Sequence, residues 1–398
     1  MSTVTGDRDK VGCTGRMIAQ VRAAATGLRR FVRPRATTGL ARLRASGLSS
    51  YHAHAPIAGR ESKVLISVII PLFNKGAYID RALDAIAAQT HTDLEVVVVD
   101  DGSTDDGPDR VRRRADPRIR LVSQPNAGPG AARNRGLADI RGELVAFLDA
   151  DDAWMPEYLE NAAQALERLG NEVATFTCGY IDWPENVSRE PFWRSRGLTD
   201  GVQRVGPATP VSHLIAMLAY MWPCSTVART AVVRRWGGFY ARDGARYAED
   251  AVLWLKVLLN HPVAFQMAPL THFHREASAL SSNYAGARPV EPFLLDPGDV
   301  ASACPPDLRP LLDRFYAARA CKTACILSLW GDRARAVQLL DTFVTRQDWS
   351  ASYFLPAHVA ATRVGHLLLR GLLRAQMLLL RRNPLARARA TDRPSSPR

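Results

Sequence analysis

The sequence predicts an α/β fold built on a mostly parallel sheet with helices on its faces. Two observations lead to this prediction. Runs of β-branched and other aliphatic residues, dense enough for buried strands, recur along residues 64–148. Segments with apolar residues at helical spacing separate these runs. Strands that alternate with helices are typical of parallel sheets, because neighbouring parallel strands need a long crossover connection.

The individual elements follow from the same two patterns. Pro71 closes the first strand, and Ile79, Leu83 and Ile86 share one face of the first helix. Strands are expected at 64–70, 94–99, 119–123, 144–148 and 172–180, and helices at 77–89, 111–115, 128–140, 156–169, 211–220 and 251–260. Ligands of such sheets bind beyond the carboxyl ends of the strands, so functional residues are expected there.

Composition and pattern divide the chain into segments. The sheet and its helices are expected to form one domain at 63–285. The other segments are a disordered basic arm at 1–62, a helical extension at 286–356, a basic amphipathic helix at 357–383 and a disordered tail at 384–398.

The formal net charge of +13 belongs to the two ends of the chain. Residues 1–60 hold eleven Lys or Arg and two Asp, and residues 363–398 hold nine Arg and one Asp. These ends contribute +9 and +8, so the region between them sums to −4. The ends lack aromatic residues interleaved at stacking spacing, and a nucleic-acid partner is therefore not expected.

The cysteines and the amino-terminal region favour a cytoplasmic location. The six cysteines show neither disulfide spacing nor a zinc-binding pattern, as in proteins of reducing compartments. The first forty residues are interrupted by Arg and contain no apolar run of the length that a secretory signal requires.

An acidic turn follows the predicted strand at 144–148. Asp149 and Asp151 form an Asp-x-Asp motif, and Asp152 follows directly. Carboxylates this close raise one another's pKa unless a cation lies among them. A small set of hard oxygen ligands suits Mg²⁺ or Mn²⁺ that also binds substrate phosphates. The alternative is a solvated acidic turn that caps the next helix.

Four sequence blocks, taken in order, resemble the family 2 glycosyltransferases of the GT-A (Rossmann-like) fold. The blocks are Ser67-Val-Ile-Ile-Pro-Leu-Phe-Asn-Lys75, Val97-Val-Val-Asp-Asp-Gly-Ser-Thr-Asp105, Asn126-Ala-Gly-Pro-Gly-Ala-Ala-Arg-Asn-Arg-Gly136 and Phe147-Leu-Asp-Ala-Asp-Asp152. Each block is modestly specific, whereas four at this spacing are highly specific. The resemblance is strong over 64–160 and looser to 282.

The resemblance implies a set of residues that bind a nucleotide-sugar. Pro71 and Phe73 would line the base pocket, with the Phe73 ring stacked on a uracil-type base. Asp101 would accept a hydrogen bond from the base, whereas Asp100 would support the loop. Arg133 and Asn134, at the start of the next helix, would hold donor or phosphate oxygens. A structural ion pair is the alternative role for Arg133.

The resemblance also implies a metal site and a catalytic base. Asp149 would contact the ribose and approach the metal, and Asp151 would be the principal ligand of Mg²⁺ or Mn²⁺. In Tyr247-Ala-Glu-Asp250, Asp250 would deprotonate the acceptor hydroxyl in an inverting transfer, with Glu249 beside it. The alternative is that both acids only favour the helix dipole. The segment that ends at Ser281 departs from the family pattern, which leaves a ligand role for His274 unsupported.

The predicted helix at 357–383 carries Arg363, Arg370, Arg374 and Arg381 on one stripe. Arginine at mid-bilayer depth disfavours spanning, so binding along an anionic membrane surface is expected, together with the basic arm at 1–62. Packing on the main domain is the alternative. The sequence thus predicts an inverting hexosyltransferase that acts on a cell-envelope glycan or lipid-linked acceptor at the inner face of the membrane. A nucleotidyltransferase and a catalytically inactive membrane-associated scaffold are the alternatives.

Overall fold

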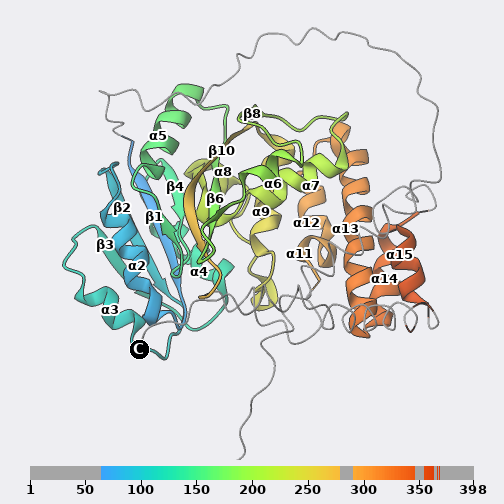
Figure 1. Cartoon of the computed structure of the whole chain (residues 1–398), viewed down its shortest axis with the longest axis horizontal. Coiled ribbons are helices and arrows are strands. Elements are labelled where there is room, and N and C mark those ends of the chain that lie inside the picture. Colours follow the sequence, from blue (N-terminus) through green and yellow to red (C-terminus); the bar gives the residue numbers. More distant parts are fainter. Residues whose placement is uncertain (1–63, 278–289, 346–353, 363–364, 366, 368–398) are drawn as a thin grey trace, which may run out of the picture. The chain divides into compact units, whose positions relative to one another are not determined.

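The structure is a computed structural model that describes residues 64–277, 290–345, 354–362, 365 and 367 (Figure 1). Among these, 64–277 and 290–316 belong to one compact unit, and the residues from 317 onward belong to a second. The arm at 1–62, the tail at 384–398 and most of the basic helix at 357–383 lie outside the described residues.

The first half of the sheet unit alternates strands and helices as the sequence predicts. Its elements are β1 (Ile66–Leu72), α2 (Gly76–Ala87), β2 (Leu94–Asp100), α3 (Gly107–Arg113), β3 (Ile119–Ser123), α4 (Pro129–Asp139) and β4 (Leu144–Phe147). Strands β1 to β4 are parallel neighbours in the order β3-β2-β1-β4. The predicted α/β class is therefore confirmed, with element bounds that differ from the expected ones by a few residues.

The second half extends the same sheet with strands of both directions. It contains β5 (Ala153–Trp154), β6 (Thr175–Trp183), β7 (Val187–Ser188), β8 (Gly201–Gln203), β9 (Thr226–Arg229) and β10 (Val263–His274). The full order is β3-β2-β1-β4-β9-β6-β10-β5, and β9 is antiparallel to both of its neighbours. The longer strands thus run in one direction, while β9 and the short strands run against them.

Sequence patterns did not predict β9 and β10. Strand β9 has only four residues, which is too short for a clear alternation. Strand β10 contains Pro269 and shifts its register against β6 on both sides of that residue.

The helices of this half are α5 (Tyr158–Leu169), α6 (Glu190–Arg194), α7 (Val211–Tyr220), α8 (Thr230–Arg235) and α9 (Glu249–Asn260).

Pro71 lies inside β1 rather than after it. The carbonyl of Ile69 accepts a hydrogen bond from Leu148, which follows β4, whereas the carbonyl of Leu72 accepts one from Asp101, which follows β2. The N–H and C=O of successive residues in a strand point alternately toward the two neighbouring strands. Like Ile69, Pro71 therefore directs its backbone toward the β4 side. Pairing with β4 ends at Ile69. The missing N–H of Pro71 therefore costs no sheet hydrogen bond, and β1 can continue to the site.

Apolar side chains cover both faces of the sheet. On one face, Ile79, Leu83 and Ile86 of α2 join a buried cluster with β1, β2 and α5, as their spacing predicts. On the other face, Phe147 of β4 contacts Phe239 at 4.8 Å and Trp254 of α9 at 6.4 Å between ring centroids. These contacts anchor α9 on the sheet and so determine where its first turn lies.

The described residues after 290 are mostly helical, as predicted. They form α11 (Pro292–Leu295), α12 (Pro297–Ala303), α13 (Arg309–Trp330), α14 (Arg333–Phe343) and α15 (Phe354–Ala361). Helices α11 and α12 pack on α9, and Lys256 of α9 pairs with Asp299 at 2.8 Å, so the sheet unit extends past the expected boundary at 285. None of the described helices is both long and apolar enough to span a bilayer.

Gly136 allows α4 to lie close against β1. A Cβ at this position would come within 2.6 Å of the Ile69 side chain. We expect Gly136→Val to lower the free energy of unfolding by about 1–3 kcal/mol, because the added atoms overpack this contact. Urea unfolding measures the change. Gly206→Val is the matched control, since a Cβ there meets no atom within 4 Å. Equal effects of both substitutions would contradict the packing argument.

Candidate active site

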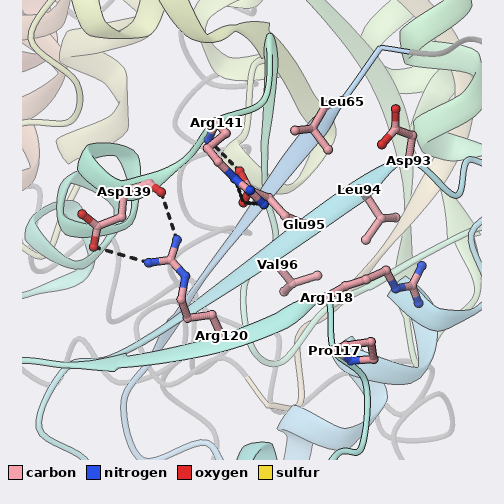
Figure 2. A pocket seen from close by; sticks show the side chains of 10 residues that line it. All are labelled: Leu65, Asp93, Leu94, Glu95, Val96, Pro117, Arg118, Arg120, Asp139 and Arg141. Atoms are coloured by element: carbon pink, nitrogen blue, oxygen red, sulfur yellow. Dashed lines mark hydrogen bonds and ion pairs between the residues drawn. The ribbon is translucent and has the colours of Figure 1, made fainter.

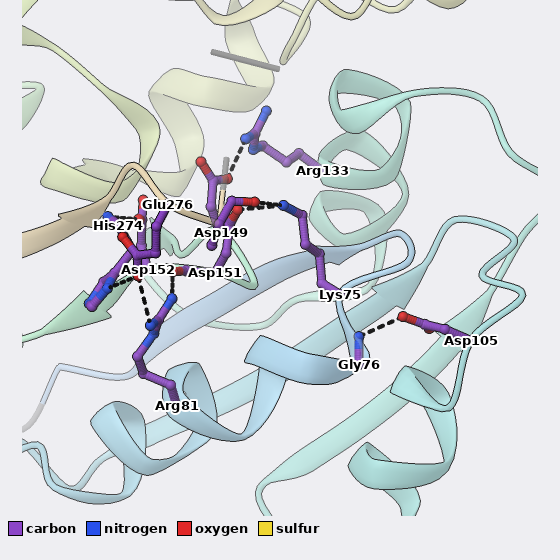
Figure 3. A network of polar contacts seen from close by, with 11 residues as sticks. Lys75, Gly76, Arg81, Asp105, Arg133, Asp149, Asp151, Asp152, His274 and Glu276 are labelled. Carbon is purple, nitrogen blue, oxygen red and sulfur yellow. Dashed lines mark hydrogen bonds and ion pairs between the residues drawn. The ribbon is translucent and has the colours of Figure 1, made fainter. Parts of the chain in front are cut away.

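Three loops with polar residues meet at one edge of the sheet. Strands β1, β2 and β4 are parallel and paired, so the loops that follow them lie side by side. These loops carry Lys75, Asp101 and the acidic turn Asp149–Asp152, and Figure 3 shows Lys75 and Arg133 directed at this turn from two sides. The predicted grouping of acids at the carboxyl ends of the strands is thus present in the fold.

Arg133 of α4 connects the acidic turn with the start of α9. Its Nη2 donates to Oδ1 of Asp149 at 2.6 Å, and its Nη1 donates to Oε1 of Glu249 at 2.8 Å. The side chain is only 4% exposed, and its guanidinium lies 5.1 Å from the centre of the Phe239 ring. Burial opposes the charge, but the two carboxylates outweigh it and hold the pKa of Arg133 above its ordinary value.

The acidic turn concentrates negative charge in a poorly solvated place. Oδ2 of Asp151 lies 2.5 Å from Nζ of Lys75. Buried Asp152 accepts a hydrogen bond from the backbone N–H of His274 at 2.8 Å. Burial, together with the charge of Asp149, raises the pKa of Asp151 although Lys75 opposes the shift. Burial and both neighbouring aspartates raise the pKa of Asp152 well above its usual value. The turn therefore lacks positive charge even with Lys75 and Arg133 beside it.

These residues fit a divalent cation that is shared with a substrate. Within the described ranges, no three His, Cys, Asp or Glu side chains are grouped so that they could hold a metal by themselves. Mg²⁺ is commonly bound by one or two carboxylates together with substrate phosphates and water. Asp151 and Asp149 supply carboxylates of that kind, whereas Asp152 points its oxygen at His274. The donor set matches an open site completed by phosphate.

Helix α9 begins with two adjacent acids. Glu249 is buried and held by Arg133, while Asp250 keeps part of its surface exposed. Burial and the neighbouring Glu249 carboxylate raise the pKa of Asp250 to about 7. The preceding Ala248 has a φ of 53°, a left-handed conformation that is unfavourable for alanine and is typical of functional sites. Asp250 therefore has the proton affinity of a general base that works near neutral pH.

Asp101 supports the loop, which is the role that the sequence analysis gave to Asp100. Its Oδ1 accepts hydrogen bonds from Gln124 at 2.7 Å and from the Ala127 N–H at 2.9 Å, and its Oδ2 accepts one from the Gly128 N–H at 2.9 Å. The side chain is buried. Three protein donors thus contact this carboxylate, and its hydrogen bond to the base of the donor remains a prediction.

Asn134 makes structural contacts within the protein, and its predicted contact with the donor remains a prediction. Its Oδ1 accepts from the N–H of Phe239 at 2.8 Å, and its Nδ2 donates to the Phe239 carbonyl at 2.7 Å. Gly238, with a φ of 71°, lies against this amide and leaves no room for a side chain. Asn134 therefore holds the turn that leads toward α9, and its amide is already occupied.

Phe73 and Pro71 remain predicted parts of the base pocket. Phe73 follows β1 and is 39% exposed, which is unusual for a large aromatic side chain and leaves its ring accessible. Pro71 is half-buried in the same strand end. An accessible aromatic ring beside a loop that follows a parallel strand can stack on a planar base.

The sequence analysis missed two cationic contacts of the acidic turn. Besides Lys75, Arg81 of α2 donates from Nη2 to the backbone carbonyl of Asp151, and its Nη1 lies 3.4 Å from Glu276 (Figure 3). Lys75 stands at the end of the first family block, so its position was visible. Its contact with Asp151 could not be predicted from the sequence, because the two residues are 76 positions apart.

A second hollow, of about 810 Å³, lies at the opposite end of the strands (Figure 2). Its lining includes Leu65 and Leu94, which stand at the amino ends of β1 and β2. Arg120 and Arg141 in this lining pair with Asp139 at 3.7 Å and Glu95 at 3.1 Å. The hollow is therefore separate from the acidic turn and contains none of the predicted site residues.

Arg133→Met tests the buried connection between the acidic turn and α9. We expect it to lower the free energy of unfolding by about 3–5 kcal/mol, because Glu249 would stay buried without its partner. Adding Glu249→Gln should recover part of this loss, as denaturant unfolding would show. Arg135→Met is the control on the same helix, since it removes an exposed ion pair and should change stability by less than about 1 kcal/mol. If the effects of Arg133→Met and Glu249→Gln on the free energy of unfolding simply add, the two side chains are not coupled and the argument is contradicted.

Comparison with known proteins finds similarity to glycosyltransferases over part of this chain. Residues 67–217 match the family model described as Glycosyl transferase family 2. An uncharacterized glycosyltransferase of Nostoc sp. is 45% identical over 105 residues, which cover 26% of this chain and 33% of that protein. The putative glycosyltransferase EpsH of Bacillus subtilis is 26% identical over 228 residues, which cover 55% and 63%. The chain thus spans from a third to nearly two thirds of the length of these relatives.

Solved structures of glycosyltransferases also resemble this chain. S. aureus TarS in complex with UDP-GlcNAc is 20% identical, with a TM-score of 0.47 and coverage of 74% of this chain and 78% of that one. The mannosyltransferase PcManGT of Pyrobaculum calidifontis, in complex with GDP-Man and Mn²⁺, is 22% identical, with a TM-score of 0.46 and coverage of 80% and 88%. The match to the Glycosyl transferase family 2 model covers the acidic turn and Arg133 and ends at residue 217, before Glu249 and Asp250.

Proposed function

We propose that this chain transfers a hexose, with inversion, from a nucleotide-sugar to a glycan or lipid-linked acceptor of the cell envelope, with a divalent cation. A UDP-sugar is the preferred donor in this proposal. One observation carries it: a single buried guanidinium, that of Arg133, joins Asp149 of the acidic turn to Glu249 beside Asp250. Donor-binding and proton-accepting groups, distant in sequence, therefore face one site.

The donor side of the proposal uses the strand ends. The exposed ring of Phe73 would stack on the base, and the carboxylate of Asp149 would meet the ribose. The backbone N–H groups at the start of α4 would face the phosphates, as helix amino termini do. Mg²⁺ or Mn²⁺ held by Asp151 would supply positive charge to the departing diphosphate.

The acceptor side uses the start of α9. Asp250 would take the proton of an acceptor hydroxyl, whose oxygen forms a bond to the anomeric carbon as the bond from that carbon to the diphosphate oxygen breaks. Attack from the face opposite the diphosphate inverts the anomeric configuration. Glu249, locked by Arg133, would keep the first turn of α9 in place and, by its charge, keep the proton affinity of Asp250 high.

The basic ends of the chain support a location at the inner face of a membrane. Residues 1–60 and 363–398 carry +9 and +8, which would attract an anionic leaflet. In the described part of the carboxyl-terminal region, Leu355 and Val359 lie on one face of α15 and are 67% and 38% exposed. Co-sedimentation with anionic vesicles tests this part of the proposal, and equal recovery with neutral vesicles would refute it.

The two alternatives make different demands on the site. A nucleotidyltransferase would need a Gly-rich loop with Lys or Arg directly after the first strand, and Leu72, Phe73 and Asn74 occupy that place. An inactive scaffold would not need a base with a pKa near neutrality, which Asp250 has. Both alternatives are therefore less well supported than sugar transfer.

Substitutions in the two acidic elements test the proposed function. A screen of nucleotide-sugars with Mn²⁺, read by calorimetry and donor hydrolysis, should find a donor for the wild-type chain. Asp151→Asn should lose the metal-dependent part of donor binding. Asp250→Asn should keep donor binding and lower turnover about 10²- to 10⁴-fold. Asp139→Asn, on the exposed end of α4, should match the wild type. Donor binding that is indifferent to Asp151→Asn would refute the metal site.

The raised pKa of Asp250 predicts opposite pH dependences for activity and stability. Transfer needs ionised Asp250, so kcat/KM should rise as the pH passes about 7. The folded-state pKa lies above the ordinary aspartate value of 3.8, so between these two values the folded protein binds a proton that the unfolded chain does not. The free energy of unfolding should therefore fall as the pH rises from about 3.8 to about 7, relative to Asp250→Asn. A constant difference between wild type and variant over this range would refute the assignment.

A further inference from the structure

The ion pair of Lys75 and Asp151 joins the loop after β1 to the acidic turn after β4. Nζ of Lys75 lies 2.5 Å from Oδ2 of Asp151, and the two side chains are 18% and 13% exposed. No other ion pair of Asp151 is present among the described residues. The carboxylate expected to bind the cation of the donor complex is thus already paired with an ammonium group of the protein.

The two aspartates of the Asp-x-Asp motif are held in different ways. Asp149 is paired with the guanidinium of Arg133, which is 4% exposed and also held by Glu249. The Arg133 guanidinium is fixed in place by two carboxylates, and moving it away from Asp149 would also disturb its pair with buried Glu249. Lys75 pairs with one carboxylate only, through a flexible stem. The partner of Asp149 is therefore fixed by a second ion pair, whereas the partner of Asp151 has no other carboxylate among the described residues to hold it in place.

Lys75 has other acceptors in reach when it leaves Asp151. Its Nζ also donates to the carbonyl oxygen of Ala277 at 2.5 Å and lies 5.6 Å from the centre of the Tyr78 ring. An ammonium group has three N–H donors, so these contacts can persist without Asp151. Meanwhile Arg81 holds the backbone carbonyl of Asp151 independently of Lys75. The turn can thus keep its position while the Asp151 carboxylate changes partner.

We propose that Lys75 is the resident counter-ion of the Asp151 site and that a divalent cation binds there by displacing the Lys75 ammonium. The proposal rests on the proposed function, since it takes Asp151 as a metal ligand. Lys75 is then a positioning residue that lowers the intrinsic affinity of the site for the cation. It leaves the site weak in the free protein, so that a cation arriving with the phosphates of a donor is bound in preference to a cation alone.

Binding of Mn²⁺ to the free chain tests this role without any turnover. Titrations of the full chain at fixed pH, followed by the electron paramagnetic resonance of free Mn²⁺, would compare wild type with Lys75→Met and Lys75→Gln. We expect both variants to bind Mn²⁺ about tenfold more tightly, which corresponds to about 1.4 kcal/mol. Lys75→Gln can still donate to the Ala277 carbonyl, so it separates loss of charge from loss of that hydrogen bond. Thermal unfolding of each variant would confirm that it is folded.

Two further variants make the outcome specific. Arg120→Met removes a positive charge that pairs with Asp139 in the hollow at the opposite end of the strands, and it should leave Mn²⁺ affinity unchanged. Adding Asp151→Asn to Lys75→Met should abolish the increase in Mn²⁺ affinity. If Asp151→Asn removes Mn²⁺ binding but the Lys75 variants bind no more tightly than wild type, displacement is refuted and the proposed function stands. If neither the wild type nor the Lys75 variants show a Mn²⁺ site that depends on Asp151, displacement is refuted, and the metal assignment is then decided by the comparison of donor binding between wild type and Asp151→Asn.

Discussion

The buried pairing of Arg133 with Asp149 and Glu249 is the interaction on which the rest of the site depends. A guanidinium that is 4% exposed is stable in this place only because carboxylates contact it from both sides. It therefore holds the turn after β4 and the first turn of α9 at a defined separation. Phe239 packs on the guanidinium, and Asn134 holds the backbone of Phe239, so the same link extends to the turn before α9.

The acids on the two sides of Arg133 are not equally neutralised, and this difference determines what each side can bind. Arg133 neutralises Glu249 and Asp149 but has no hydrogen bond to Asp250, whose pKa is raised to about 7. On the other side, burial and mutual repulsion raise the pKa values of Asp151 and Asp152 above that of a free aspartate, because the nearby positive charge does not balance the negative charge of the turn. One side thus favours taking a proton, and the other favours taking a cation. A transferase that separates a sugar from a diphosphate needs both properties within one cleft.

The family blocks also contain polar residues whose contacts within the protein could not be predicted from local pattern. Asp101 and Asn134 stand in family blocks, yet Asp101 accepts three hydrogen bonds from its own loop and Asn134 holds Phe239. Their spacing could not show this, because a polar side chain near a ligand site can serve either the ligand or the backbone around it. Strand β10 could not be predicted from local pattern either, because it contains Pro269 and pairs with β6 only with shifts of register on both sides of that residue.

What the sequence by itself determined is local: the alternating strands and helices from β1 to β4, the acids that follow those strands, and the two acids that begin α9. Periodicity and turn chemistry are short-range properties, so they can be read without coordinates. The tertiary structure alone decided which charges meet. Lys75 reaches Asp151 over 76 positions and Arg133 reaches Glu249 over 116, because parallel strands and the packing of α4 and α9 bring them together. Contacts of that range depend on how the elements pack, which no local pattern encodes.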